Sequence, residues 1–139
     1  MKRIDAYLFF DKNNCREAFT FYQECLGGDL FFMPVSESPA AEQFPPNMAD
    51  FILHACLKKG DIMLMASDNC VGQPIVTGKN ICLSLSCDSE EEVHALYAKL
   101  SAGGQASNPP KLEFWGDVFG SLTDKYGFEW MIAYTLPKP

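Results

Sequence analysis

The fold of this chain is decided by residues 114–132, which read FWGDVFGSLTDKYGFEWMI. The stretch predicts two β-strands, 117–123 and about 128–134, joined by a tight turn that ends at Gly127. Glycine at that position supplies the positive φ that the reversal of the chain requires. The hairpin carries large aromatic side chains, which should border either a core or a concave site: Trp115, Phe119 and Trp130.

A similar but weaker hairpin pattern occurs earlier in the chain, around the turn at Gly60. Each half of the chain begins with an apolar strand and continues into an amphipathic helix, and the helices should end at the Gly-Gly pairs 27–28 and 103–104. The pattern in each half therefore predicts secondary-structure elements in the order β-α-β-β-β. Two such halves indicate an internal duplication.

The first module is expected at about residues 3–68 and the second at about 80–136, within a single domain of 139 residues. Residues 68–79 contain two Gly and one Pro and predict a linker between them. Residues 34–49 predict a loop in the first module, and Pro109-Pro110 predicts a turn before the final hairpin of the second.

The starts of both helices carry capping residues. Asn13 or Asn14 is a suitable N-cap for the first helix. Ser89 followed by Glu92 is a capping box for the second.

Composition excludes several classes of partner. The net charge is −7 and no run of basic residues exceeds two, so we expect no nucleic-acid binding. The longest apolar runs have five residues, which is too short to span a membrane. No signal peptide is evident, which predicts a cytoplasmic protein in which the six cysteines, none in a C-x-x-C motif, are ordinary reduced thiols.

Several motifs together resemble the PhnB-like branch of the vicinal oxygen chelate (glyoxalase/bleomycin-resistance/extradiol dioxygenase) superfamily. They are Tyr7-Leu8-Phe9-Phe10, Leu26-Gly27-Gly28, His54-Ala55, Leu64-Met65-Ala66-Ser67-Asp68 and, most specifically, the Trp115-Gly116 hairpin. The resemblance implies an α+β fold of two tandem βαβββ modules, whose U-shaped mixed sheet forms a cup, and a homodimer. Members often carry the label of a demethylubiquinone methyltransferase, but this chain has no glycine-rich stretch that resembles a nucleotide site for S-adenosylmethionine. We therefore expect no methyltransferase activity.

The resemblance also implies where a metal would be held. Metal-dependent members of the superfamily place His or Glu ligands on four strands, and the matching positions here are Asp5 or Tyr7, then Met65, then Asn80 or Cys82, and finally Met131. Thioethers are poor ligands for divalent Mn, Fe, Ni or Zn. The sequence therefore predicts no metal cofactor.

Three residues remain as weak metal candidates. His54 has the strand parity of a residue that faces the cup, or else it is a satisfied, partly buried histidine. Asp68 either lines the rim of the cup or caps the chain at the end of its strand, and Glu129 either faces the cup or is solvated. A site formed by all three requires that they converge.

The favoured function is metal-free binding of a small molecule in the cup. Ser84, Ser86 and Cys82 have no neighbouring base in the sequence, so no catalytic residue is assigned. The alternatives are a divalent-metal-dependent lyase, isomerase or dioxygenase, and a non-catalytic dimeric scaffold. The residues expected to contact the ligand are Tyr7, Phe9, His54, Met65, Asp68, Ser84, Trp115, Phe119 and Met131.

Overall fold

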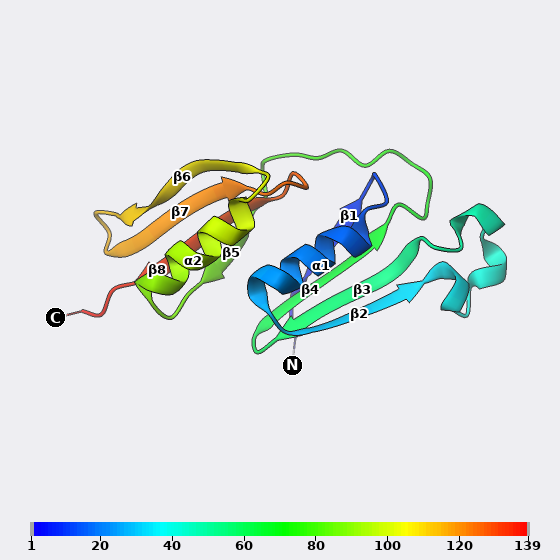
Figure 1. Cartoon of the computed structure of the whole chain (residues 1–139), viewed down its shortest axis with the longest axis horizontal. Helices are drawn as coiled ribbons and strands as arrows, with labels where there is room; N and C mark the ends of the chain where they lie inside the picture. Colours follow the sequence, from blue (N-terminus) through cyan, green and yellow to red (C-terminus); the bar gives the residue numbers. More distant parts are fainter. Residues whose placement is uncertain (1, 139) are drawn as a thin grey trace. The chain divides into compact units, whose positions relative to one another are not determined.

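The chain forms two units of the same design, Met1–Val76 and Thr77–Pro139, in a computed structural model that describes residues 2–138 (Figure 1). The boundary between the units lies within the segment expected to link the two modules. Within residues 2–138, no helix has the length and apolar character needed to cross a membrane.

The first unit contains one helix and a four-stranded mixed sheet, here called sheet A. The strand order is β1-β4-β3-β2, in which β1 runs parallel to β4 and the other neighbours are antiparallel. Its elements are β1 (Ala6–Phe10), α1 (Cys15–Leu26), β2 (Asp29–Pro34), β3 (Ile52–Lys59) and β4 (Ile62–Asp68). The segment predicted to be a loop, 34–49, instead contains three single-turn 3₁₀ helices: Val35–Glu37, Ala41–Gln43 and Pro46–Met48.

The second unit repeats this plan with a second sheet, called sheet B. The strand order is β5-β8-β7-β6, and β5 runs parallel to β8 as β1 does to β4. Its elements are β5 (Leu83–Ser86), α2 (Glu90–Ser101), β6 (Gln105–Leu112), β7 (Asp117–Thr123) and β8 (Glu129–Thr135). The predicted duplication of a βαβββ module is therefore confirmed.

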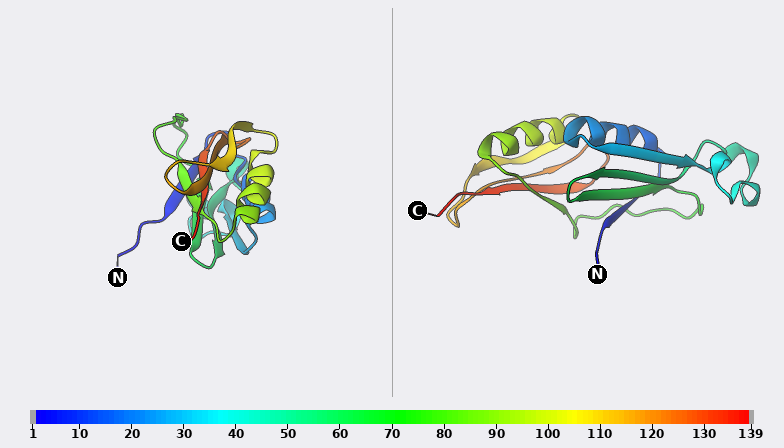
Figure 2. Two further views of the ribbon diagram at one scale, coloured as in Figure 1. Left: turned by 90° about the vertical axis from the view of Figure 1, so that its left-hand side faces the viewer. Right: turned by 90° about the horizontal axis from the view of Figure 1, so that it is seen from below.

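In each unit the helix covers one face of the sheet (Figure 2). Strand side chains alternate between the two faces, and on the inner strands of sheet B, β7 and β8, the residues that face the helix are buried, whereas the edge strands β5 and β6 contain no buried residue. We call the opposite face, which the helix does not cover, the open face of sheet A or of sheet B. The core of the first unit includes Leu8, Phe19, Tyr22, Leu57 and Ala66, and that of the second includes Val93, Leu100, Leu122, Trp130 and Ile132.

The two helices begin in different ways. Ser89 Oγ accepts a hydrogen bond from Glu92 N at 3.1 Å, and Glu92 Oε1 accepts one from Asp88 N at 2.8 Å, so the predicted capping motif is present. Asn14 stands at the N-cap of α1 but its side chain makes no capping bond. Asp68 Oδ1 accepts from Cys15 N at 2.9 Å instead, and its negative charge suits the positive end of the helix dipole.

The prediction of a turn at Pro109-Pro110 is wrong, because β6 runs through both prolines. Proline lacks the N–H that an interior strand must donate, but β6 lies at the edge of sheet B and pairs only with β7. The pairing of β6 with β7 shifts on both sides of Asn108. A Cβ atom at Gly120 of β7 would lie 3.0 Å from Pro110, so glycine allows the strand to approach here.

Candidate ligand-binding site

A pocket of about 640 Å³ lies on the open face of sheet B. Three adjacent strands bring its floor together. Ser84 of β5 pairs with Met131 of β8, and on the next pleat Ala133 of β8 lies between Ser86 of β5 and Phe119 of β7. The pocket is lined by Ser84, Ser86, Cys87, Asp88, Trp115, Asp117, Phe119, Met131, Ala133, Tyr134 and Thr135.

Trp115 lies in the short loop that leads into β7 and is held there by its neighbours. Its indole Nε1 donates a hydrogen bond to Asp117 Oδ2 at 3.0 Å, and its ring packs edge-on against Phe119 with centroids 5.8 Å apart. Gly116 has a φ of 95°, which lets the loop turn between the two aromatic residues. Trp115 nevertheless stays 50% exposed, so an oriented indole is available to a ligand.

The polar groups of the pocket come from β5, from the start of β7 and from the segment that joins β5 to α2. Ser84, Ser86 and Asp88 are exposed, whereas Asp117 is half-buried beside Trp115. Burial, and next the carboxylate of Glu92, raise the pKa of the Cys87 thiol to about 11. This thiol is therefore almost entirely protonated at neutral pH and is a poor nucleophile there.

Four predicted ligand contacts from the first unit lie on the open face of sheet A. Tyr7 pairs in register with Met65, and Phe9 follows Tyr7 on the same face. The Tyr7 hydroxyl lies 3.2 Å from His54 Nδ1, and the two rings stack with centroids 5.9 Å apart. Burial raises the pKa of Tyr7, while the neighbouring Ser67 side chain acts in the opposite direction. Tyr7 therefore remains a neutral hydroxyl beside the imidazole at physiological pH.

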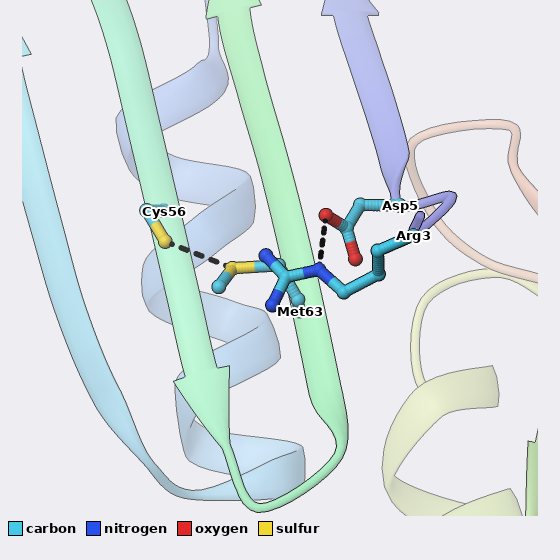
Figure 3. A network of polar contacts seen from close by, with 4 residues as sticks. All are labelled: Arg3, Asp5, Cys56 and Met63. Atoms are coloured by element: carbon cyan, nitrogen blue, oxygen red, sulfur yellow. Dashed lines mark hydrogen bonds and ion pairs between the residues drawn. The ribbon is translucent and has the colours of Figure 1, made fainter. Parts of the chain in front are cut away.

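Sulfur atoms meet on the open face of each sheet. On sheet A, Cys56 Sγ of β3 lies 3.2 Å from Met63 Sδ of β4, and Arg3 Nε lies 2.9 Å from Asp5 Oδ2 in an ion pair just before β1 (Figure 3). In the second unit, Cys82 Sγ lies 3.1 Å from Met131 Sδ. These contacts place polarizable sulfur atoms at Met63 and Met131, where they pack against a neighbouring thiol.

Asp68 does not belong with the other predicted contact residues. It is 3% exposed and lies at the end of β4 on the side of sheet A that packs against α1. Its two carboxylate oxygens accept hydrogen bonds from Cys15 N at 2.9 Å and from Ile52 N at 2.8 Å. The capping interpretation therefore accounts for Asp68.

The candidate metal set of His54, Asp68 and Glu129 is wrong, because His54 and Asp68 lie on opposite faces of sheet A. Glu129 accepts a hydrogen bond from the Thr123 hydroxyl on the neighbouring strand. Among residues 2–138, no group of three or more His, Cys, Asp or Glu side chains is placed to hold a metal ion.

The positions that match the superfamily's metal ligands do not fit a divalent centre either. Met65 and Met131 offer thioethers, and the contact of Cys82 with Met131 adds a thiol to a thioether. Asp5, one of two candidates for the first position, is paired with Arg3. Divalent Mn, Fe, Ni and Zn prefer imidazole and carboxylate donors.

The structure brings four of the predicted residues into one pocket: Ser84, Trp115, Phe119 and Met131. Sequence reasoning assigned no contact role to Asp117, although it has the same strand parity as Phe119, and it overlooked Ala133 and Thr135, which share the parity of Met131. The alternation of side chains along the strands therefore predicts that these three residues face the pocket. The alternation of side chains along the strands does not predict the other two, Asp88 and Tyr134. Asp88 lies in the segment before α2, and Tyr134 lies near the end of β8.

The chain matches the family model described as 3-demethylubiquinone-9 3-methyltransferase over residues 2–133. It is 28% identical to protein YjdN of Escherichia coli (strain K12) over 146 residues, which covers 98% of this chain and 97% of that protein.

Solved structures share the fold over nearly the whole chain. Protein PA1353 from Pseudomonas aeruginosa is 38% identical with a TM-score of 0.86, covering 97% of this chain and 98% of that chain. A PhnB protein from Bacillus cereus has a TM-score of 0.74 at 22% identity, covering 96% and 100%. A glyoxalase/bleomycin resistance protein/dioxygenase family enzyme from Burkholderia phytofirmans has a TM-score of 0.66 at 15% identity, again covering 96% and 100%, and shows the fold alone. The chain belongs to the 3-demethylubiquinone-9 3-methyltransferase family, and it shares its fold with solved proteins described as PhnB and as glyoxalase/bleomycin resistance proteins.

Proposed function

We propose that the protein binds a small, flat, largely apolar molecule in the pocket on the open face of sheet B, without a metal. The oriented, half-exposed indole of Trp115 is the observation that carries this proposal. A volume of about 640 Å³ is within the range of pockets that hold small ligands. Aromatic walls with a few polar groups at the edge are typical of such sites.

The chemistry of the lining supports binding rather than catalysis. Cys87 holds its proton at neutral pH, as its raised pKa of about 11 requires. Among the residues that the structure describes, those lining the pocket include no histidine to act as a base for Ser84 or Ser86. The methyltransferase in the family's description is therefore not part of this proposal.

Trp115→Ala tests the proposal directly. We expect the substitution to weaken binding of Nile red, an uncharged planar fluorophore, by about 1–3 kcal/mol, because a stacked aromatic anchor is lost. The measurement is a fluorescence titration at fixed salt. Phe31→Ala is the matched control, since Phe31 is 51% exposed, much as Trp115 is, and does not line the pocket, so the affinity of this variant should equal that of the wild type.

Two results would refute the proposed pocket. One is wild-type affinity in a folded Trp115→Ala protein, as judged by its circular dichroism spectrum. The other is an equal loss of affinity in Phe31→Ala, which would indicate non-specific adsorption to exposed aromatic rings.

We also propose that the protein is a homodimer and that the second copy covers the open face of sheet A. Three large side chains on this face are exposed in one copy: Tyr7 by 39%, Phe9 by 54% and Phe31 by 51%. Covering them would remove an apolar patch from water. Whether Tyr7, Phe9, His54 and Met65 also contact a ligand stays a prediction.

Sedimentation at micromolar concentration should give about twice the chain mass of 15.5 kDa. Phe31→Asp should shift the protein towards a monomer, because a desolvated carboxylate at the contact is costly. Phe114→Asp introduces the same charge at an exposed position of the second unit and should leave the dimer intact. A monomeric wild-type protein would contradict this proposal.

A further inference from the structure

We infer that the pocket on the open face of sheet B selects flat molecules that carry a positive charge. This inference rests on the proposed function and specifies the class of ligand. Two carboxylates, Asp117 and Asp88, line the pocket. Among the described residues, none of those lining it is a Lys, Arg or His, so negative charge faces the ligand without a balancing positive group.

The aromatic walls favour the same ligand. Trp115, Phe119 and Tyr134 line the pocket together with the two carboxylates. Aromatic faces attract cations through the negative potential of the π-system, and tryptophan does so best. A cation held between an indole and a carboxylate gains from both, whereas an anion is repelled by both.

Asp117 is the central residue of this arrangement. It is half-buried, lies on the same face of β7 as Phe119, and pairs in register with Thr135 of β8. Oδ2 accepts the hydrogen bond from Trp115 Nε1 at 3.0 Å, so the carboxylate is held beside the indole in a fixed orientation. Partial burial weakens the screening of its charge by solvent, which strengthens its attraction for a cation.

Charged groups near the pocket do not reverse this preference. Lys111 of β6 pairs in register with Phe119, but its Nζ lies 3.9 Å from Glu113 Oε1, so a carboxylate accompanies it. Glu129, on the same face of β8 as Met131, bonds to the Thr123 hydroxyl. The net charge of −7 adds a long-range field that draws cations to the protein.

Three probes of nearly equal shape separate charge from shape: trimethyl(2-naphthylmethyl)ammonium, its uncharged 2-neopentylnaphthalene analogue, and 2-naphthylmethanesulfonate. We expect calorimetric titration to show the cation binding about tenfold or more tightly than the uncharged analogue, and the anion more weakly still. Raising the salt concentration should weaken binding of the cation and leave the uncharged probe unaffected.

Asp117→Asn removes the charge but keeps an oxygen that accepts from Trp115 Nε1. It should reduce the preference for the cation to about threefold or less, with the uncharged probe bound as in the wild type. Glu91→Gln is the matched control, because it removes one negative charge from an exposed position on α2 outside the pocket. Its preference for the cation should be unchanged.

The outcomes distinguish this inference from the proposed function. Equal affinity for all three probes, lost in Trp115→Ala, would overturn the preference for a cation and leave the binding pocket standing. A preference that falls equally in Asp117→Asn and Glu91→Gln would assign it to net charge and overturn the role of Asp117. Binding of none of the probes, with no binding of Nile red, would overturn both.

Discussion

Asp124→Ala should lower the free energy of unfolding of the second unit by roughly 3–5 kcal/mol, because three N–H groups lose the buried carboxylate that accepts their hydrogen bonds. Asp124 is 3% exposed at the end of β7. Its Oδ1 accepts from Tyr126 N at 2.8 Å and from Phe128 N at 3.1 Å, and its Oδ2 accepts from Trp130 Nε1 at 2.8 Å. The carboxylate thus joins the turn of the final hairpin to the core tryptophan.

Urea unfolding followed by tryptophan fluorescence measures this loss. Both tryptophans of the chain, Trp115 and Trp130, lie in the second unit, so the signal reports on that unit. Asp124→Asn keeps one acceptor oxygen and should show a smaller loss than Asp124→Ala. A loss below about 1 kcal/mol in Asp124→Ala would show that water replaces the carboxylate at little cost.

Asp68→Ala should destabilise the first unit by roughly 2–4 kcal/mol. The substitution leaves Cys15 N and Ile52 N without their carboxylate acceptor and removes a negative charge from the start of α1. The measurement is urea unfolding followed by circular dichroism. Asp61→Ala, at an exposed position of the turn between β3 and β4, should change stability by no more than about 0.5 kcal/mol.

The same variant distinguishes a structural Asp68 from a ligand contact. Folded Asp68→Ala protein should bind Nile red as the wild type does, because Asp68 does not line the pocket. Weaker binding by folded protein, with unchanged stability, would return Asp68 to the ligand contacts and contradict its role as a cap.

The sequence by itself determined the order of the elements and the faces of the strands. The final hairpin follows from local rules. Gly127 has a φ of 93° and donates its N–H to Asp124 O at 3.0 Å, as the turn prediction required. The alternation along β5 and β8 placed Ser84 and Met131 on one face, because successive side chains of a strand point in opposite directions.

Only the tertiary structure decided which of these residues meet. Asp68 bonds to amides 53 and 16 residues away in sequence, so no local pattern separates a cap from a rim residue. Pro109 and Pro110 lie in a strand because β6 is an edge strand, and position in a sheet is not encoded in a dipeptide. The pocket joins strands that are far apart in the chain, and it brings Asp117 and Asp88 to one lining. Strand pairing is a long-range choice made by packing, whereas turns and side-chain alternation are set within a few residues.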